Sequence, residues 1–333
     1  MKVAIVGASG AVGQEFLRVL DERNFPLDEL VLFGSKRSAG TKYTFRGKQI
    51  EVKLLQHNDD FKGVDIAFTS AGAGTSKEFA ETITKYGAVM IDNSSAFRMD
   101  ADVPLVVPEV NAADAKDRPR RIIANPNCTT IVSLVAINAL NQDSPIESII
   151  ASSYQAVSGA GAGGPIELLN EVERLGQGEP VEPKVFQYQI AYNVIPQIGG
   201  EAFEGYTSEE MKMQNEGRKI MHLPELKVSC TCVRVPVVRS HSVSIVVRTR
   251  EKISVERARQ LIAAAPGCRL VDDLANKRYP MPLETSDQDL VFVGRIRDDL
   301  TSDNGLNIWC CGDQVRKGAA TNAVQIAQLL VQE

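Results

Sequence analysis

A chain of 333 residues exceeds the size at which a single hydrophobic core usually stops growing, so we expect two domains. Its 44% hydrophobic and 24% charged residues are typical of a soluble globular protein, and a net charge of −5 without a basic run argues against a nucleic-acid partner. No apolar stretch approaches the roughly 18 residues that span a membrane, and the N-terminus starts with a strand pattern instead of a signal peptide, which predicts a cytoplasmic location.

The six cysteines do not resemble a disulfide framework in so long a chain, and we expect free thiols in a reducing compartment. Cys230 and Cys232 are separated by one residue, and Cys310 and Cys311 are adjacent. Neither spacing is typical of a tetrahedral zinc site, and the three histidines are scattered, so no metal site is expected.

The chain begins with the apolar strand Lys2–Val6, followed at once by the glycine turn Gly7–Gly13 and a segment with helical periodicity. Gly7 permits a tight turn, Gly10 lets the backbone approach a pyrophosphate, and Gly13 lets helix and strand pack closely. The spacing is G-x-x-G-x-x-G, and a purely structural turn is the alternative. The order of strand, turn and helix nevertheless favours a dinucleotide site at this turn.

The next strand, Glu29–Phe33, ends in Gly34–Ser38, where a domain that prefers NAD would carry an acidic residue for the ribose 2′-hydroxyl. Here Ser35, Arg37 and Ser38 offer hydroxyls and a cation, which suit a 2′-phosphate and therefore favour NADP. A solvated surface turn is the alternative interpretation.

Strands and helices continue to alternate, which predicts a parallel sheet with helices on both faces. The expected elements are the strands Asp65–Ser70, Ala88–Asp92, Val103–Val107 and Arg121–Ala124 and the helix Thr75–Tyr86. Arg98 follows the carboxyl end of one of these strands, the side on which such sheets bind ligands, and it could hold an anion there. A solvated loop arginine is the commoner alternative.

Cys128 lies where a strand leads into the apolar helix Thr129–Leu140. The aligned dipoles at a helix start lower the pKa of a thiol below its usual ~8.5, and the free N–H groups there can bind an oxyanion. By position alone, an inert buried cysteine is an equally good interpretation.

The second half of the chain has a different character. The strand Ser148–Val157 carries Gln155 and is followed by the glycine-rich segment Ser158–Gly164, after which a helix begins at Pro165. The glycines are either a flexible connector or a place where backbone approaches a cofactor. Residues 178–204 are rich in proline and glycine, which favours an ordered loop.

A capping box at Thr207–Glu210 predicts a helix through Met221, on which Glu216 and Lys219 would form an exposed ion pair. Further on, the pattern predicts the helix Ser254–Ala265, two strands of one sheet and a final amphipathic helix. These last three elements are Leu290–Arg297, Gly305–Cys311 and Gln314–Val331.

Between these helices, Val228–Val235 and His241–Val247 alternate as strands. If they form a hairpin, Arg234 and His241 lie opposite each other and cap an apolar stripe. A histidine on such a face is usually a satisfied core residue, but a buried arginine needs a partner, and a bound carboxylate would be one.

Motifs along the whole chain carry a resemblance to a known family. They are Gly7–Gly13, Asn93–Arg98, Val107–Asn111, Asn125–Cys128, Tyr154–Gly161, Cys232–Pro236, Ser240-His241 and Phe292–Arg297. Through them the chain resembles bacterial aspartate-β-semialdehyde dehydrogenases from end to end. The resemblance implies an α/β fold, in which a Rossmann-like parallel sheet in residues 1–127 plus 314–333 binds NADP. Residues 128–313 would form a second, α+β domain for catalysis and for assembly into a homodimer.

The implied activity is the reversible, NADPH-dependent reduction of L-aspartyl 4-phosphate to L-aspartate 4-semialdehyde and phosphate, on the route to lysine, threonine, methionine and isoleucine. The resemblance places the nucleophile at Cys128, next to Asn127 of the catalytic set, and the acid/base histidine at His241. Gln155 would orient the thioacyl group, and Arg234 would bind the substrate carboxylate. The ammonium would fall to Glu216, and the phosphate to Arg98 and Lys219. The cofactor would be bound by Gly7, Ser9, Gly10, Ala11, Val12, Ser35, Arg37, Ser38, Ala71, Gly72, Ser158, Gly159 and Gln314.

These residue types suit the implied chemistry. A thiolate attacks the acyl phosphate, cations stabilise the departing phosphate, and a thioester remains for hydride transfer. The resulting thiohemiacetal would collapse with help from an imidazole that titrates near neutrality.

Two other functions compete with this interpretation. An N-acetyl-γ-glutamyl-phosphate reductase has a similar fold and thioester chemistry, but its acetylated substrate has no ammonium to match Glu216. A non-catalytic NADP-binding protein is the other, and the presence of Cys128, Gln155, Arg234 and His241 argues against it.

Overall fold

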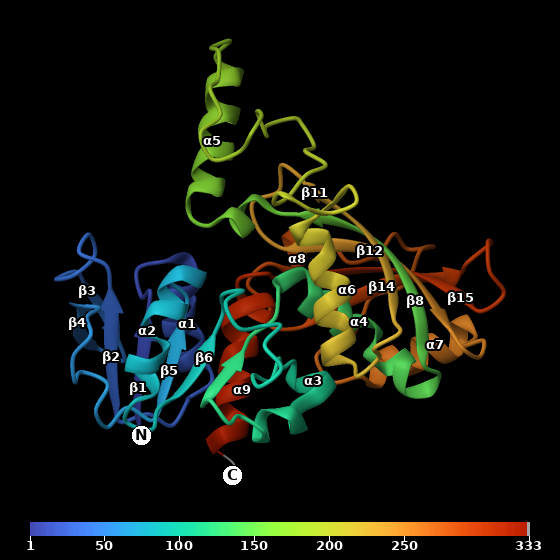
Figure 1. Ribbon diagram of the computed structural model, residues 1–333. Coiled ribbons are helices and arrows are strands. Elements are labelled where there is room, and N and C mark those ends of the chain that lie inside the picture. The colour runs from blue at the N-terminus through green and yellow to red at the C-terminus, as the bar shows by residue number, and fades with distance from the viewer. Residues whose placement is uncertain (332–333) are drawn as a thin grey trace. The chain divides into compact units, whose positions relative to one another are not determined.

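The computed structural model of the protein describes residues 1–331, which fall into two compact units (Figure 1). The first unit contains residues 1–127 and the chain from Ala319 onward, and the second contains Cys128–Gly318. The chain thus returns to the first unit at Ala319, whereas the sequence suggested a return at Gln314. Residues 332 and 333 of that predicted segment lie outside the described residues.

The first unit is built on a seven-stranded sheet in the order β3-β4-β2-β1-β5-β6-β7. All neighbouring strands are parallel except β3 and β4, which form an antiparallel edge hairpin. The strands are β1 Lys2–Val6, β2 Glu29–Gly34, β3 Lys42–Phe45, β4 Lys48–Leu54, β5 Ile66–Thr69, β6 Val89–Asp92 and β7 Ile122–Ala124. The parallel sheet expected from the sequence is therefore confirmed.

Helices cover both faces of this sheet. On one face, α1 (Ala11–Glu22) and α9 (Thr321–Val331) share a core with β1 and β5, and Phe16 stacks on Phe68 with ring centroids 4.7 Å apart. On the other face, α2 (Ala73–Thr84) is tied to the sheet because Ser76 donates a 2.6 Å hydrogen bond to the buried Asp92. A short helix α3 (Pro108–Asn111) and a 3₁₀ turn (Ala112–Lys116) precede β7.

Two parts of this sheet differ from expectation. Val103–Val107 is not a strand, because only Leu105 forms a bridge, to Ala124 of β7. The hairpin β3-β4 was missed because most of its side chains are exposed, and a strand without a buried face has little hydrophobic periodicity.

The second unit contains a six-stranded sheet in the order β11-β8-β12-β15-β14-β13 and a separate two-stranded ribbon, β9-β10. The strands are β8 Ile146–Gln155, β9 Glu201–Phe203, β10 Tyr206–Thr207, β11 Lys227–Arg234, β12 His241–Thr249, β13 Cys268–Leu270, β14 Val291–Asp298 and β15 Gly305–Gly312. The helices are α4 Cys128–Asp143, α5 Gly163–Gly176, α6 Ser208–Ile220, α7 Val255–Ala264 and α8 Pro282–Thr285.

The predicted hairpin between β11 and β12 is wrong, because β8 lies between these two strands. β11 runs parallel to β8, with Arg234 opposite Gln155, and β12 runs antiparallel on the other side, with Ser242 opposite Tyr154. The chain between β8 and β11 contains α5 and α6, and it is long enough for the crossover that a parallel pair requires. The short link from β11 to β12 therefore passes the end of β8.

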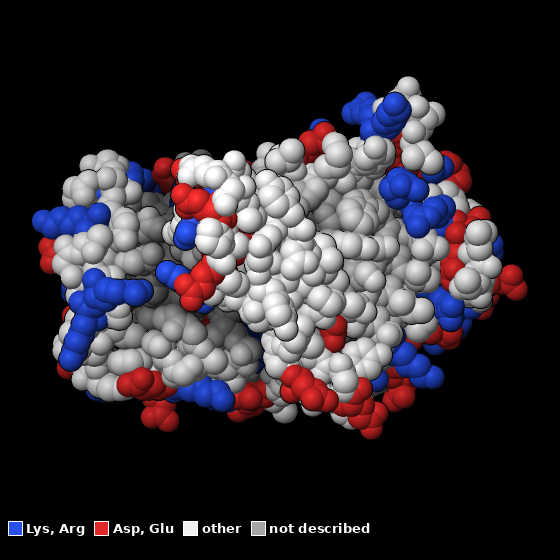
Figure 2. Space-filling model, turned by 90° about the horizontal axis from the view of Figure 1, so that it is seen from above, with Lys and Arg blue, Asp and Glu red and all other residues white. Residues whose placement is uncertain are grey.

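Three of this unit's helices lie on one face of the six-stranded sheet. α4, α6 and α7 pack on it, and α4 is buried at every position from Thr129 to Leu140, as expected of a helix that is apolar all round. On the opposite face Ile150 and Tyr154 are exposed, and Trp309 lies against Tyr154 with ring centroids 5.6 Å apart. Seen from above, the middle of this unit's surface carries few charged side chains (Figure 2).

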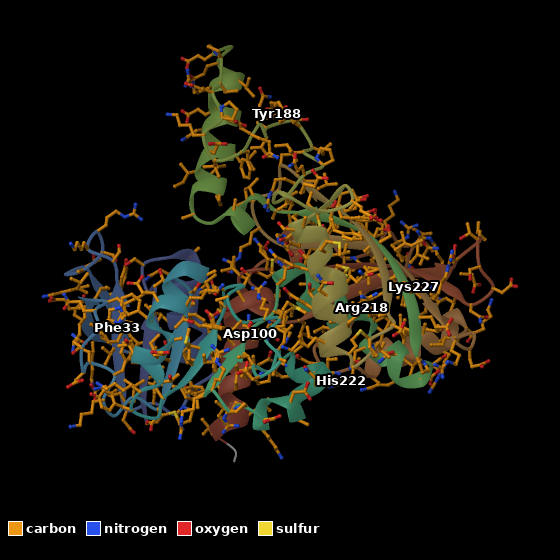
Figure 3. All side chains as sticks on the ribbon, viewed as in Figure 1. Phe33, Asp100, Tyr188, Arg218, His222 and Lys227 are labelled. Carbon is orange, nitrogen blue, oxygen red and sulfur yellow. The ribbon has the colours of Figure 1, made fainter. Side chains whose placement is uncertain are left out.

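α5 and the loop after it project from the sheet as an arm (Figure 1). Two buried carboxylates on α5 hold the returning loop: Glu167 accepts hydrogen bonds from the backbone of Lys184, Val185 and Phe186, and Glu171 from Ile190 and Ala191. Tyr188, on the same loop, is exposed (Figure 3). The loop predicted for residues 178–204 is thus ordered, and it ends in β9.

Among residues 1–331, no helix is both long and apolar enough to cross a membrane.

Candidate active site

Cys128 is the first residue of α4, as the sequence predicted, and its side chain is partly exposed. Its Sγ lies 3.5 Å from Nε2 of His241, the first residue of β12. A thiol at a helix start beside an imidazole is the arrangement of an activated sulfur nucleophile, because the helix dipole and the ring can both stabilise a thiolate.

Strand order brings the other candidates to the same end of the sheet. Gln155 ends β8, Arg234 ends β11 opposite it, and His241 begins β12 on the other side. Because β8 separates the two outer strands, its last side chain falls between theirs. Gln155 Nε2 donates to Ser153 Oγ at 3.2 Å and to Glu209 Oε1 at 3.3 Å, so its amide is oriented from within the protein.

His241 is completely buried, and its environment keeps it neutral. Burial first, and the Arg234 guanidinium second, lower the pKa of His241 to about 3, while Glu209 opposes them. The backbone N–H of Ala156 donates to its Nδ1 at 3.0 Å. The expectation of a ring that titrates near neutrality is therefore wrong for the protein without substrate.

Arg234 is also buried, and its Nη1 donates a 2.7 Å hydrogen bond to the carbonyl of Ala156. Burial lowers the pKa of Arg234, and Cys128 and Glu209 oppose that shift, so both acidic groups lie within electrostatic reach of the guanidinium. Its Cζ lies 5.8 Å from the ring centroid of Phe186. The sequence indicated that Arg234 needs a partner. A guanidinium has five N–H donors, and the Ala156 carbonyl accepts a hydrogen bond from only one of its nitrogens.

Glu209 is a member of this cluster that sequence reasoning missed. It is buried on α6, and Lys212 donates a 2.8 Å hydrogen bond to its Oε2. The capping box drew attention to Glu210 instead, whose side chain closes that box. The sequence could have indicated Glu209 through its spacing, because it lies seven residues before Glu216 and residues two turns apart share one face of a helix.

The loop before His241 is held in a strained conformation. Ser240 has a φ of 77°, a left-handed value that is uncommon outside glycine, and its N–H donates to Gln314 Oε1 at 2.8 Å. Gln314 also donates to Ser158 Oγ, which in turn donates to the carbonyl of Val238 at 2.6 Å. Two residues predicted as cofactor contacts, Ser158 and Gln314, therefore also fix the position of the histidine.

Two glycines lie directly against Cys128, Arg234 and His241. A Cβ at Gly159 would come within 2.7 Å of Arg234 Nη1 and 3.1 Å of His241 Cε1. A Cβ at Gly318, in the π-helical turn Arg316–Ala320, would come within 2.8 Å of the Cβ of Cys128. No sequence pattern indicated the contact of Gly318 with Cys128, because the two residues are far apart along the chain.

We expect Gly318→Ala to lower kcat about 10²-fold if Cys128 is the nucleophile, because the new methyl group must displace this residue and a shift of about 1 Å costs a factor of this size. The rate at which iodoacetamide alkylates Cys128 should change with it. Gly176→Ala is the matched control, since nothing lies within 4 Å of a Cβ there. Unchanged kcat and alkylation in Gly318→Ala would contradict this role.

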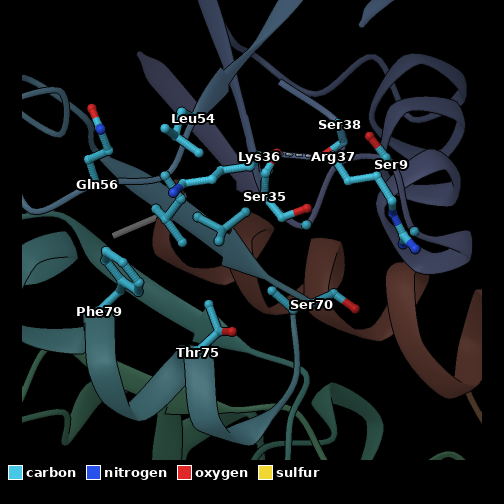
Figure 4. Close-up of a pocket in the computed structure, with 16 residues that line it drawn as sticks. Ser9, Ser35, Lys36, Arg37, Ser38, Leu54, Gln56, Ser70, Thr75 and Phe79 are labelled. Carbon is cyan, nitrogen blue, oxygen red and sulfur yellow. Dashed lines mark hydrogen bonds between the residues drawn. The ribbon is translucent and has the colours of Figure 1, made fainter. Parts of the chain in front are cut away.

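The first unit contains a cavity of about 590 Å³ beside the glycine turn (Figure 4). It is lined by Gly7, Ser9 and Gly10, by Gly34–Ser38 after β2, by Ser70 and Ala71, by Leu54–Gln56, and by Thr75 and Phe79 of α2. Gly7 has a φ of 88°, and a Cβ there would lie 2.3 Å from the carbonyl oxygen of Ser70, so only glycine fits. Of the predicted cofactor residues in this unit, Ala11, Val12 and Gly72 do not line the cavity.

Arg98 is buried in the first unit, so the solvated alternative is wrong. It donates to the carbonyls of Asn125 at 3.0 Å and Asn93 at 2.9 Å, which join the loops after β6 and β7. Asn127 is buried too. On α6 of the second unit, Glu216 is only 2% exposed, so it does not lie on the surface, where the sequence suggested an exposed ion pair with Lys219.

Among residues 1–331, no group of three or more histidines, cysteines, aspartates or glutamates has a geometry that could hold a metal ion.

Comparison with known proteins matches both units to one family. Residues 2–118 match a family model described as "Semialdehyde dehydrogenase, NAD binding domain", and residues 137–317 match "Semialdehyde dehydrogenase, dimerisation domain". The chain is 53% identical to the aspartate-semialdehyde dehydrogenase of Aquifex aeolicus and 48% to that of Synechocystis, covering 100% of this chain and 98% of each relative.

A solved structure, aspartate semialdehyde dehydrogenase II from Vibrio cholerae complexed with ASA, has a TM-score of 0.97 and 45% identity, over 100% of this chain and 98% of that one. The fold, the matched family models and the identity along the full length agree with one another. The protein belongs to the aspartate-semialdehyde dehydrogenase family.

Proposed function

We propose that the protein catalyses the reversible, NADPH-dependent reductive dephosphorylation of L-aspartyl 4-phosphate to L-aspartate 4-semialdehyde and phosphate. The observation that carries this proposal is the partly exposed Cys128 Sγ at the start of α4, 3.5 Å from His241 Nε2. The family of the chain supports the choice of substrate. The reaction would serve the biosynthesis of lysine, threonine, methionine and isoleucine.

Each polar group near Cys128 has a task in this reaction. The sulfur attacks the acyl carbon, phosphate leaves, and a thioester remains on Cys128. Gln155, oriented by Ser153 and Glu209, would align the thioacyl group, and the free arm of Arg234 would bind the substrate carboxylate bidentately.

The remaining assignments rest on the family resemblance. Glu216 would bind the substrate ammonium, Arg98 and Lys219 would bind the phosphate, and Asn127 would support the nucleophile. The cavity in the first unit suits the cofactor, because it combines backbone at a helix N-terminus with hydroxyls and cations at the end of β2. When bound, the reduced nicotinamide supplies the hydride.

The test of the function is an assay in the reverse direction with two substrates side by side. We expect NADPH to form from aspartate semialdehyde only when phosphate is present, and not from N-acetylglutamate semialdehyde, whose blocked nitrogen carries no charge for Glu216. Activity with the acetylated substrate alone would favour the competing reductase. Absence of activity with either substrate would favour a non-catalytic NADP-binding protein.

Preference for NADP over NAD is predicted to depend on Arg37, which lines the cavity with Ser35 and Ser38. In Arg37→Glu, we expect the KM for NADPH to rise about 10- to 100-fold, because a charge-assisted hydrogen bond contributes about 1.5–3 kcal/mol. The KM for NADH should fall or stay constant. Lys48→Glu, the same charge change at an exposed site away from the cavity, should alter neither value.

We propose that the protein forms a homodimer through the open face of the six-stranded sheet, where Ile150 and Tyr154 are exposed. In Ile150→Glu, we expect the mass measured by light scattering to fall to that of a single chain, because a buried unpaired charge would oppose pairing. Leu300→Glu adds the same charge at a more exposed leucine on a turn and should leave the dimer intact. A dimeric Ile150→Glu would rule out this face. The cytoplasmic location remains a prediction.

A further inference from the structure

The backbone of Arg234 is held by the loop that returns from the arm. Arg234 ends β11, which is an edge strand of the six-stranded sheet. On its inner side it pairs with Gln155 of β8, and on its outer side it forms an isolated bridge with Ile195 of the returning loop. The Arg234 N–H donates to the Ile195 carbonyl at 2.8 Å, and the Ile195 N–H donates to the Arg234 carbonyl at 3.0 Å. The loop therefore takes the place of a neighbouring strand at this residue.

The same loop places an aromatic ring beside the Arg234 side chain. The guanidinium carbon lies 5.8 Å from the centroid of the Phe186 ring, within the roughly 6 Å over which a cation is attracted to the face of a ring. Both side chains are buried, so little water screens this attraction. The arm thus contacts the backbone of Arg234 and its charged group.

The Phe186 ring is itself fixed in position. The Phe186 N–H donates to Glu167 of α5 at 3.0 Å. A Cβ at Gly164, near the start of α5, would lie 2.0 Å from the carbonyl oxygen of Val157 and 3.4 Å from Cζ of Phe186, so this glycine allows the helix to pack against both residues. The ring belongs to a small apolar core that contains Val157, Leu168, Phe186, Ile190, Ala191 and Ile195. Val157 follows Ala156, whose carbonyl accepts the hydrogen bond from the guanidinium, so one core supports both contacts of the arginine.

An aromatic ring can restrain a guanidinium without occupying its hydrogen-bond donors. Nη1 of Arg234 donates to the Ala156 carbonyl, and Nε and Nη2 have no hydrogen-bond partner among residues 1–331. A carboxylate in the place of Phe186 would bind these donors, whereas the ring leaves them for a ligand. The contact therefore suits an arginine that must be both immobile and open to a substrate.

We propose that Phe186 is a positioning residue for Arg234, and that the returning loop of the arm forms one wall of the site for the substrate carboxylate. This inference rests on the proposed function. The ring would hold the guanidinium where its free donors meet the carboxylate. Because the carboxylate does not react, its binding contributes equally before and during the reaction, and loss of the ring should raise KM and leave kcat unchanged.

The kinetic test is Phe186→Leu, which keeps an apolar side chain but removes the ring. We expect the KM for aspartate semialdehyde to rise about 3- to 30-fold, with little change in kcat or in the KM for phosphate. Tyr188→Leu, a similar change at an exposed position of the same loop, is the matched control and should alter none of these values. An unchanged KM in Phe186→Leu, or a lower kcat without a higher KM, would overturn the proposal.

A double-mutant cycle with Arg234→Ala separates positioning from a general loss of structure. If Phe186 acts through Arg234, Phe186→Leu should lower kcat/KM by less than about twofold once the arginine is absent. An equal loss with and without Arg234 would mean that the ring only supports the fold, and the proposal would fail. If Phe186→Leu does not fold, a trifluorinated phenylalanine at position 186 keeps the ring but weakens its negative face, and the same cycle applies.

The contact can also be measured without substrate, by NMR of protein labelled with ¹⁵N-arginine. The Nε–H signal that is missing from Arg234→Ala belongs to Arg234. An aromatic ring shifts the signals of nearby protons, so Phe186→Leu should move this signal and Tyr188→Leu should not. An unmoved signal in Phe186→Leu would contradict the proposal. A moved signal in a protein without dehydrogenase activity would instead refute only the proposed function.

Discussion

Cys128→Ala is expected to lower kcat by a factor of about 10⁴ or more, the largest effect of any single change in this protein. Without the sulfur no thioester can form, and the helix N-terminus and Arg234 have no bound intermediate to stabilise. The measurement is phosphate-dependent NADPH formation, together with mass spectrometry of protein quenched during turnover with aspartyl phosphate. Wild-type protein should carry an acyl adduct at Cys128.

The control for this experiment is Cys268→Ala, which removes another partly exposed thiol, one that donates to the carbonyl of Val135. It should keep its activity and its acyl adduct. If Cys128→Ala retained more than about 1% of wild-type kcat, or if the adduct lay on another cysteine, the thioester mechanism would be wrong.

Arg234→Lys is expected to lower kcat/KM for aspartate semialdehyde about 10²-fold, mainly through KM. Lysine keeps the positive charge but cannot bind the Ala156 carbonyl and a substrate carboxylate at once with a planar fork. The loss corresponds to about 3 kcal/mol, within the range for disrupting a buried, hydrogen-bonded charge pair.

Alkylation of Cys128 by the uncharged reagent iodoacetamide separates the two roles of this arginine. Arg234→Lys should be alkylated at nearly the wild-type rate, because the charge beside the sulfur remains. Arg234→Ala should be alkylated more slowly, because that charge is gone. Arg250→Lys, at an exposed site paired with Glu147, is the control and should change neither KM nor alkylation. An unchanged KM in Arg234→Lys would exclude this residue from binding the carboxylate.

Features that depend on only a few neighbouring residues were predicted correctly from the sequence. The strand, glycine turn and helix at the N-terminus, the start of a helix at Cys128 and the capping box at Thr207 all appear as predicted. These features depend on backbone propensity, on side-chain periodicity and on hydrogen bonds to near neighbours. The sequence contains all of that information within one turn or one strand.

Several wrong predictions share one cause: a sequence pattern does not show which distant segments lie next to each other in the fold. Adjacent strands with a short link suggested a hairpin, but β11 pairs with β8 because the long crossover through α5 and α6 permits a parallel neighbour. Glu216 looked like one half of a surface ion pair, since spacing on a helix does not reveal which face is covered. His241 was expected to titrate near neutrality, because its depressed pKa comes from burial and from Arg234 on another strand.

The sequence by itself therefore determined the succession of elements, the glycine turn and the position of a cysteine at the head of a helix, because local interactions specify each of them. Only the tertiary structure decided that Gln155 falls between Arg234 and His241, that Gly318 packs against Cys128, and that the Ala156 N–H donates to Nδ1 of His241. These arrangements depend on strand order and on contacts between segments far apart in the chain. Their stability comes from burying the whole sheet and its helices together, which no short stretch of residues encodes.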